Sequence, residues 1–236
     1  MNISVSYYSS IGGRKKNEDT VFMSESCENL IGMVADGLGG HENGELASKL
    51  AIKTINMEIM HKTVSIPALR DAVEKANEQI VYNADHSSMK STIAAVWMDE
   101  HCVLAVNVGD TRIYQFREKE IIYQSVDHSV AEISYLAGDI SKEEIRTSKE
   151  RHKLTRALGG QKDVKADIVP LKLRRGDALL LCSDGFWEKI KESEMLNDLS
   201  GIMDAGIWLS RMKNRIKENH DLEKGDNHSA IAIIVM

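Results

Sequence analysis

The chain has few of the residues on which specialised scaffolds depend: three cysteines, two prolines and 5% aromatic residues among 236. Cys27, Cys102 and Cys182 are odd in number and form no C-x-x-C pair, which argues against a disulfide framework. Aliphatic side chains must therefore fill most of the core, and the 42% hydrophobic content is sufficient for one. The composition predicts a single domain over residues 1–236 in a reducing compartment, which we take to be the cytoplasm.

Long apolar runs and an excess of positive charge are also missing. No uninterrupted apolar stretch approaches ~20 residues, so no membrane span is expected, and residues 1–10 lack the regions of a signal peptide. The formal net charge of −6 argues against nucleic acid or an anionic membrane as a partner. We expect a monomer that binds other proteins.

Short apolar runs and amphipathic stretches alternate along the chain. Strand character is present in residues 3–8, 21–24, 30–35, 92–98, 102–108, 112–116, 121–124, 166–171, 178–182 and 229–235. Helical periodicity is present in residues 44–61, 67–84 and 205–218. This order indicates an α+β fold in layers.

Two further expectations concern particular segments. In the first helix, one face is approximated by Leu46, Leu50, Ile55 and Ile59, and we expect Met57 and Met60 to pack in the core. Residues 129–153 are polar and helical in character, and they interrupt the run of strands. We interpret them as an inserted flap.

Acidic residues stand at the ends of several predicted strands. Three apolar runs lead directly into Asp36, Asp110 and Asp184, while Asp226 precedes the last strand and Glu18 and Asp19 precede the second. If these side chains meet at one rim, their charges repel unless cations lie between them. Oxygen ligands without a cluster of histidine and cysteine favour Mg²⁺ or Mn²⁺.

A turn is the alternative for each single acid, because Asp-Gly after a strand is a common hairpin turn. Asp177 illustrates it, since Asp177 opens the strand that Asp184 closes. Seven residues at ~3.3 Å each separate the two acids by ~23 Å, so both cannot join one site. We assign Asp177 to a turn, and the same alternative stays open for Asp110.

Six short motifs occur in a fixed order and each stands against a suitable strand. They are RKKNED (14–19), DGLGGH (36–41), GDTR (109–112), LTRALG (154–159), CSDG (182–185) and DN (226–227). In this order the chain resembles the protein phosphatase 2C-type (PPM) metal-dependent phosphatases, in particular their compact bacterial branch. The resemblance runs from Arg14 to Val235.

The resemblance implies a four-layer αββα sandwich of two mainly antiparallel sheets flanked by helix pairs. It implies an enzyme that removes phosphate from serine and threonine side chains by direct attack of a metal-activated water, opposing a kinase. It implies two core ions and a weaker third, held by Glu18, Asp36, Gly37 (through its carbonyl), Asp110, Asp184 and Asp226. The resemblance further implies that Asp36 bridges the two core ions. It implies that Arg14 binds the substrate phosphate and that Asp19 and Asn227 support the ion ligands.

One departure from the resemblance concerns proton donation. Leu38 follows Asp36–Gly37 where many eukaryotic relatives carry a histidine proposed as the general acid, so the identity of that acid stays open. His41 and His128 carry little weight as catalytic residues, His128 being expected to form local hydrogen bonds. Arg156 is expected to have a structural role under the flap.

Three rival functions were compared with the residues. A cysteine phosphatase requires arginine six residues after its cysteine, but Met33, Val108 and Glu188 occupy those positions. A nucleotide-binding enzyme would be indicated by a G-x-G-x-x-G motif or a P-loop, and neither motif is complete in this sequence. The remaining alternative is an inactive pseudophosphatase that acts as an interaction module. The complete acidic set favours the enzyme.

Overall fold

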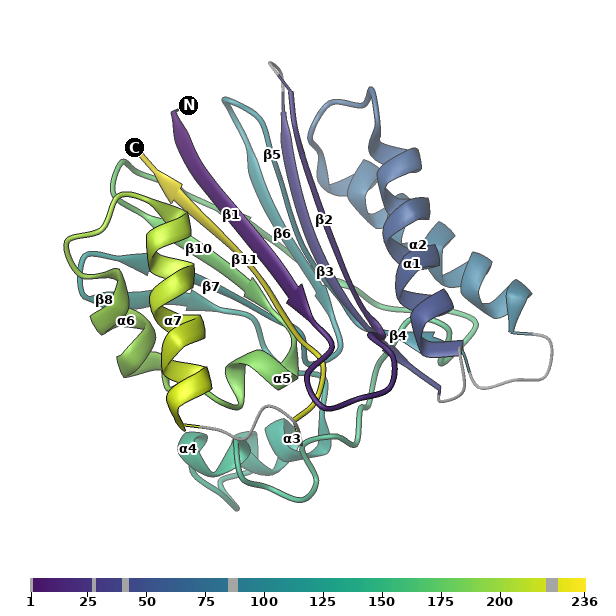
Figure 1. Cartoon of the computed structure of the whole chain (residues 1–236). Helices are drawn as coiled ribbons and strands as arrows, with labels where there is room; N and C mark the ends of the chain where they lie inside the picture. Colours follow the sequence, from purple (N-terminus) through teal and green to yellow (C-terminus); the bar gives the residue numbers. More distant parts are fainter. Residues whose placement is uncertain (1, 27–28, 40–42, 85–88, 220–224) are drawn as a thin grey trace.

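The fold, given by a computed structural model, contains two antiparallel sheets packed face to face. The structure describes residues 2–26, 29–39, 43–84, 89–219 and 225–236. His41 and Cys27, both named above, lie outside these ranges. In Figure 1 helices cover the outer face of each sheet, which confirms the predicted αββα layering.

The first sheet has five strands in the order β1-β11-β10-β7-β8. Their bounds are β1 Ile3–Ser10, β11 His228–Val235, β10 Ala178–Cys182, β7 Arg112–Arg117 and β8 Glu120–Gln124. The second sheet has the order β2-β3-β5-β6-β9, with β4 paired to the end of β3. Its bounds are β2 Asp19–Glu25, β3 Leu30–Leu38, β4 Lys90–Ser91, β5 Ile93–Met98, β6 Val103–Val108 and β9 Asp167–Leu171.

The helices form two outer layers and one insertion. Helices α1 (Asn43–Ile59) and α2 (Ile66–Asn83) cover the second sheet, while α6 (Glu192–Leu199) and α7 (Ala205–Asn219) lie beside the first (Figure 1). The short α5 (Asp184–Trp187) follows β10 directly. Two further short helices, α3 (Val130–Leu136) and α4 (Lys142–Ile145), lie below the sheets in this view.

Side-chain alternation explains why the central strands are apolar throughout. In β10, Leu179 and Leu181 face the other sheet, whereas Leu180 and Cys182 face the helices. Successive side chains of a strand point to opposite faces, so a strand buried on both faces shows no polar alternation. Burial on both faces fixes the position of each inner strand in the sandwich, and the residues at the ends of these strands reach one rim.

The structure corrects the expected packing of α1. Ile55 and Ile59 are buried as predicted, but Leu46 is 52% exposed, and Met57 and Met60 are exposed too. The buried stripe instead includes the small residues Ala47 and Ala51. Small side chains allow α1 to lie close against β3, and a search for large apolar residues misses such a stripe. Helices α5 and α6 were not predicted either.

Residues 129–153 leave and re-enter the fold at one point. Ser129 and Leu154 form an isolated antiparallel bridge. The Val130 N–H donates to the carbonyl of Lys153 at 2.9 Å, and the Thr155 N–H donates to the carbonyl of His128 at 2.8 Å. These hydrogen bonds close the base of the segment as a short two-stranded neck.

Asp177 lies before β10, at the end of the strand opposite to Asp184. It is buried and accepts hydrogen bonds from Arg117 Nε at 2.8 Å, Gln115 Nε2 at 2.9 Å and the Arg174 N–H at 2.9 Å. These donors hold the pKa of Asp177 below its ordinary value, although burial alone raises it. The assignment of Asp177 to a turn is confirmed.

In the part of the chain that the structure describes, no helix combines the length and the apolar character that crossing a membrane requires.

Candidate active site

The acids at the strand ends meet at one rim of the sandwich. Asp19 and Asp36 are directly opposite each other in the β2–β3 register, so their side chains lie on the same face. Asp184 follows β10, and Asp226 precedes β11, the strand paired with β10. The two turns touch, because a Cβ on Gly185 would lie 2.0 Å from the Asn227 carbonyl oxygen.

The charges of these acids act on one another. Burial raises the pKa of Asp36 well above its ordinary value, and further increases come from the carboxylates of Asp184, Asp19, Asp110 and Asp226. Burial likewise raises the pKa of Asp19 to about 7, against hydrogen bonds from Ser229 and Ser183. A set of buried like charges of this kind is stable at neutral pH only with protons or cations between its members.

Glu18 and the carbonyl of Gly37 converge beside the start of α1. A Cβ placed on Gly44 would lie 2.6 Å from Glu18 Oε1 and 2.8 Å from the Gly37 carbonyl oxygen. Only glycine leaves this space open, and two oxygen atoms border it. Burial raises the pKa of Glu18, while the charge of Arg14 acts in the opposite direction.

Arg14 lies at the edge of the rim. Its Nη2 donates to Asp226 Oδ2 at 2.6 Å, and the guanidinium is exposed on its other side. Asn227 fixes the loop that carries Arg14, because its Nδ2 donates to the carbonyls of Ile11 at 2.7 Å and Lys16 at 2.9 Å. Its Oδ1 accepts from the Glu18 N–H at 2.8 Å. One amide side chain thus sets the positions of both Arg14 and Glu18.

Asp19 is held from the β10 side. Its Oδ2 accepts a hydrogen bond from Ser183 Oγ at 2.7 Å, and Ser183 Oγ accepts from the Ser229 N–H at 3.0 Å. The other oxygen, Oδ1, is buried and lacks a hydrogen-bond partner among the described residues. A buried acceptor without a donor is a strong indication of a missing bound species.

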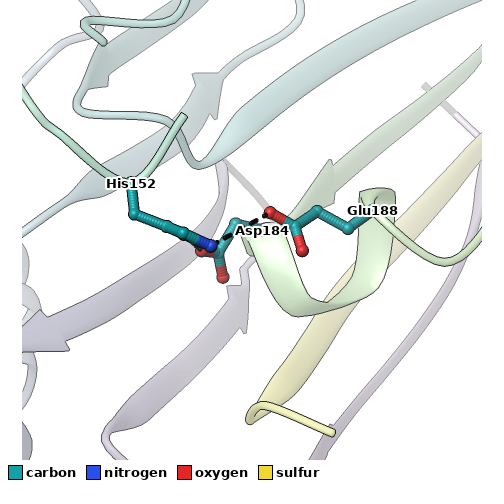
Figure 2. Close-up of side chains that lie close together, drawn as sticks. All are labelled: His152, Asp184 and Glu188. Carbon is teal, nitrogen blue, oxygen red and sulfur yellow. Dashed lines mark ion pairs between the residues drawn. The ribbon is translucent and has the colours of Figure 1, made fainter. Parts of the chain in front are cut away.

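Sequence reasoning missed one histidine at the rim. His152, in the neck of the flap segment, lies with Nδ1 3.5 Å from Asp184 Oδ2 (Figure 2). The hydrogen bond to Asp184 raises the pKa of His152, and burial opposes it. Glu188 of the turn after α5 completes the group, with Oε1 3.9 Å from His152 Nε2. No sequence spacing connects residue 152 with residue 184, so the pattern gave no signal.

Asp110 is buried and faces the same charges. Burial raises the pKa of Asp110 well above its ordinary value, and the negative charges of Asp184 and Asp127 raise it further. Its carbonyl accepts a hydrogen bond from Trp187 Nε1 at 2.9 Å. The Asp110 carboxyl is therefore a buried acid whose pKa responds to the charge of Asp184, and the turn hypothesis for Asp110 stays untested.

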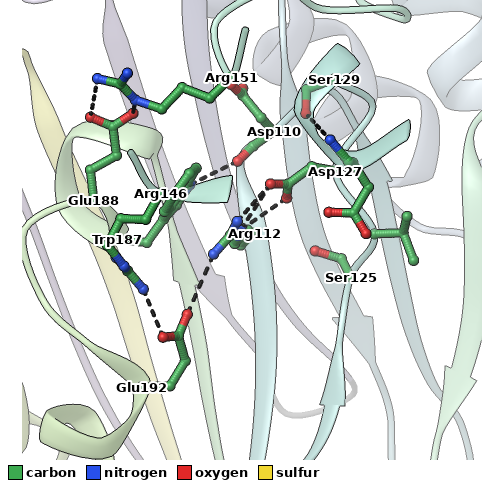
Figure 3. Close-up of polar contacts among 12 residues, drawn as sticks. Asp110, Arg112, Ser125, Asp127, Ser129, Arg146, Arg151, Trp187, Glu188 and Glu192 are labelled. Atoms are coloured by element: carbon green, nitrogen blue, oxygen red, sulfur yellow. Dashed lines mark hydrogen bonds and ion pairs between the residues drawn. The ribbon is translucent and has the colours of Figure 1, made fainter. Parts of the chain in front are cut away.

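A buried network connects Asp110 to the flap segment (Figure 3). The Arg112 guanidinium lies 3.5 Å from the centroid of the Trp187 ring and donates to both oxygens of Asp127, from Nη2 at 2.7 Å. Glu192 accepts from Arg112 Nη1 at 3.4 Å and from Arg146 Nη2 of the flap at 2.7 Å. The half-buried ion pair between Arg146 and Glu192 therefore joins the flap to the buried pair of Arg112 and Asp127.

His128 and Arg156 have structural contacts, as predicted. His128 is buried, and its Nδ1 accepts from the Gly109 N–H at 3.0 Å. Arg156 Nη1 pairs with Asp167 Oδ1 at 2.9 Å and donates to the Lys165 carbonyl at 3.0 Å. Both residues support the neck of the flap from below.

Comparisons with known proteins agree with this geometry. The sequence model described as Protein phosphatase 2C matches residues 8–223. The chain is similar to the serine/threonine phosphatase stp of Listeria welshimeri, with 34% identity over 193 residues and 77% of each chain covered. Among solved structures it is similar to serine/threonine phosphatase Stp1 from Staphylococcus aureus, with a TM-score of 0.90, 26% identity, and 100% and 96% of the two chains covered. It is also similar to the catalytic domain of serine threonine protein phosphatase PstP in complex with 2 manganese ions, with a TM-score of 0.82, 25% identity and both chains covered completely.

Proposed function

The chain belongs to the protein phosphatase 2C family, and from this membership we propose how its acidic rim hydrolyses phosphoserine and phosphothreonine. It is a metal-dependent serine/threonine protein phosphatase. The observation that carries the proposed mechanism is the convergence of Glu18, Asp36, Asp184 and Asp226 at one rim, with Arg14 at its edge.

The residues at the rim fit two divalent cations. All donors are oxygen atoms, the carboxylates repel one another, and the space beside Gly44 is bordered by two oxygens. We assign Asp36 to both ions, Asp184 and Asp226 to the first, and Glu18 with the Gly37 carbonyl to the second. The similar PstP domain, in complex with 2 manganese ions, supports Mn²⁺ or Mg²⁺ in this number.

A third, weaker cation is assigned to Asp110 and Asp184. The support is the buried Asp110 carboxylate, whose pKa is raised by burial and by Asp184. Two protein ligands bind a cation less tightly than the larger sets assigned to the core ions. The turn hypothesis for Asp110 predicts no such cation.

Bound cations at such a rim lower the pKa of a coordinated water and neutralise phosphoryl oxygens. The chain's own residues do the rest. Arg14, exposed on one side, binds the phosphate through its planar fork after exchanging Asp226 for the substrate. Asp19 accepts a hydrogen bond from Ser183 through Oδ2, and its other oxygen, Oδ1, orients an ion ligand or a bound water at the rim. Asn227 keeps Arg14 and Glu18 at a fixed separation.

We further infer the setting in which the enzyme works. Its substrates are phosphorylated proteins, and a serine/threonine kinase supplies them, because hydrolysis of a phosphoester needs a reaction that forms it. The thiols of Cys102 and Cys182 are unpaired, which supports a reducing cytoplasm. We expect a monomer with one domain, in which residues 129–153 are the flap, and no nucleic-acid partner.

The test uses peptides that carry phosphoserine, phosphothreonine or phosphotyrosine, with Mn²⁺ or with excess chelator. We expect release of phosphate from the first two in Mn²⁺ and none in chelator. Full activity in chelator, with the absence of metal verified by elemental analysis, contradicts the mechanism. Replacing Cys27, Cys102 and Cys182 together by serine or alanine is the matched control, and in a folded variant it leaves turnover largely intact if no thiol is the nucleophile.

A further inference from the structure

We propose that His152, in the neck of the flap, donates a hydrogen bond to the ester oxygen that leaves from phosphorus. The inference rests on the proposed function and adds a residue for which the sequence gave no signal. His152 stands between two features of the surface. On one side is Asp184 of the rim, 3.5 Å from Nδ1 (Figure 2). On the other side is a hollow of about 440 Å³.

The hollow has the size and lining of a subsite for a peptide. It is lined by His152, Leu38, Gly39, Lys90, Thr155 and Arg156, among others. Leu38 and Gly39 follow the metal-binding Asp36–Gly37 directly, so the hollow begins where the rim ends. A phosphorylated peptide that places its phosphoryl group at the rim has room for its chain here.

The ester oxygen must then lie at the boundary between rim and hollow, because it joins the phosphoryl group to the peptide. His152 occupies this boundary, with its side chain 50% exposed. Leu38, which follows Asp36–Gly37 and also lines the hollow, is aliphatic and offers no side-chain donor. An imidazole carries at least one N–H in both its neutral and its charged form, so the hydrogen bond does not depend on its protonation.

The residues on both sides of His152 hold the backbone at this position. Its neighbours Lys153 and Thr155 form the two hydrogen bonds of the neck, at 2.9 and 2.8 Å. On the other side Arg151 holds Glu188, with Nε 2.5 Å from Oε1 and Nη2 3.4 Å from Oε2. Because Arg151 already neutralises Glu188, the group of His152, Asp184 and Glu188 is a poor cation site in comparison with the rim.

The reaction balances with the hydrogen bond in place. A water oxygen forms a bond to phosphorus while the bond from phosphorus to the serine oxygen breaks. The serine oxygen keeps the bonding electron pair and gains one proton, which balances the proton that the attacking water loses, so that water and phosphoester yield the serine hydroxyl and inorganic phosphate. The His152 N–H stabilises the negative charge that develops on the serine oxygen before the proton arrives.

The experiment compares His152→Ala and His152→Asn with His101→Ala, a control histidine that is 82% exposed in the turn between β5 and β6. Turnover in Mn²⁺ is measured on a phosphoserine peptide and on p-nitrophenyl phosphate, whose leaving group needs little help. We expect His152→Ala to lower kcat on the peptide by ~10-fold or more and on the aryl phosphate by much less. His152→Asn should recover part of the loss, because its amide also donates.

A second readout does not depend on turnover. In Mg²⁺, a peptide with a non-hydrolysable phosphonate in place of the phosphoserine should shift the imidazole NMR signals that disappear in His152→Asn. Equal losses on both substrates, unchanged peptide turnover, a higher Mn²⁺ requirement in His152→Ala, or ring signals that do not respond to the bound phosphonate each overturn the proposal. If wild type and His101→Ala were both inactive, the proposed function would fail, and the ring signals would still test His152.

Discussion

At the scale of single residues, the rim is a site of electrostatic repulsion that the fold tolerates. Asp19 and Asp36 face each other across β2 and β3, and the carboxylates of Asp184 and Asp110 add to the field at Asp36. Apolar strands that bury both faces hold these acids together against their repulsion. The metal-free protein therefore carries a local cost that bound cations remove.

The first prediction concerns Asp36→Asn in metal-free protein. A raised folded pKa means that this group contributes stability at low pH that is lost as the pH rises toward that pKa. Removing the charge should therefore raise the free energy of unfolding at pH 7 by ~1 kcal/mol or more, since one pKa unit corresponds to ~1.4 kcal/mol. Urea denaturation of both proteins in chelator measures the difference.

The same variant should lose most of the stabilisation that Mn²⁺ gives to the wild type. The advantage of Asp36→Asn should also shrink as the pH is lowered toward the unfolded pKa, because protonating the wild-type acid on folding then costs less free energy. If the variant were less stable than the wild type in chelator at pH 7, the repulsion at the rim would be refuted.

The second prediction separates Arg14 from the cation ligands. Arg14→Ala should raise KM for phosphopeptides by ~10-fold or more, because a charge-assisted contact to the phosphate is lost. Its metal affinity should stay equal or rise slightly, since Arg14 competes with the first cation for Asp226. Calorimetric titration with Mn²⁺ and steady-state kinetics measure the two effects.

Lys15→Ala is the matched control for Arg14, because it removes the same charge from the same loop. Lys15→Ala should leave KM within about twofold of the wild-type value, because Arg14 and not Lys15 is the residue that pairs with Asp226 at the rim. Loss of the tight metal sites in a folded Arg14→Ala protein would assign Arg14 to the metal centre instead of the substrate.

The acids of the site could be predicted from the sequence, but His152 could not. Asp36, Asp110 and Asp184 each end an apolar strand, and strands carry their ends to a common rim. His152 lies in a polar segment whose path depends on the neck formed by Ser129 and Leu154. Such a bridge is a tertiary contact without a local pattern. The same limitation applies to Glu188, which follows a short helix that was not predicted.

At the scale of elements, the flap is joined to the sandwich by charge as well as by its neck. Arg112 of β7 lies between Asp127, just before the flap, and Glu192 of α6, which also pairs with Arg146 at the end of α4. Trp187 stacks on Arg112 and donates to the carbonyl of Asp110. A change in this network should reach both the flap and Asp110.

The third prediction therefore concerns Asp127→Asn. The side chains of Asp127 and Arg112 are 2% and 4% exposed, so the variant leaves a buried guanidinium whose remaining carboxylate partner among the described residues is Glu192, at 3.4 Å. Breaking a buried pair from one side costs about 3–5 kcal/mol, and we expect a loss of ~3 kcal/mol in urea denaturation.

Glu120→Gln, on the exposed start of the adjacent β8, is the control and should change stability by less than ~0.5 kcal/mol. Equal stability of Asp127→Asn and wild type would show that the ion pair contributes nothing. If amide hydrogen exchange became faster only in the flap of Asp127→Asn, with no change in global stability, the network would lie outside the cooperative core.

Helices and strands could be predicted where large apolar residues repeat at a regular spacing. They were harder to predict where small residues form the buried face or where the start of a helix depends on a capping contact. The central strands were found because both of their faces are buried. The face of α1 was misplaced because Ala47 and Ala51 pack against the sheet, while Leu46 points outward. Helix α6 begins where the Lys191 N–H donates to Glu194 Oε2 at 2.8 Å, and it is only eight residues long, so its periodicity is weak.

At the scale of the whole molecule, two sheets present their strand ends to the same solvent-exposed edge. The end of β3, the turn after β10 and the turn before β11 meet there because β10 pairs with β11 and the two sheets stack face to face. The flap, whose helices α3 and α4 lie below the sheets (Figure 1), adds the neck with His152 beside Asp184. The central claim is that this arrangement holds two divalent cations on Asp36.

Anomalous X-ray scattering from crystals grown with Mn²⁺ tests this claim most directly. We predict two strong peaks that share Asp36, one beside Asp184 and Asp226 and the other beside Glu18 and the Gly37 carbonyl. Both peaks should be lost or greatly weakened in Asp36→Asn crystals grown in the same way. Crystals without a peak at Asp36, grown from protein that hydrolyses phosphopeptides in the same buffer, would contradict the account.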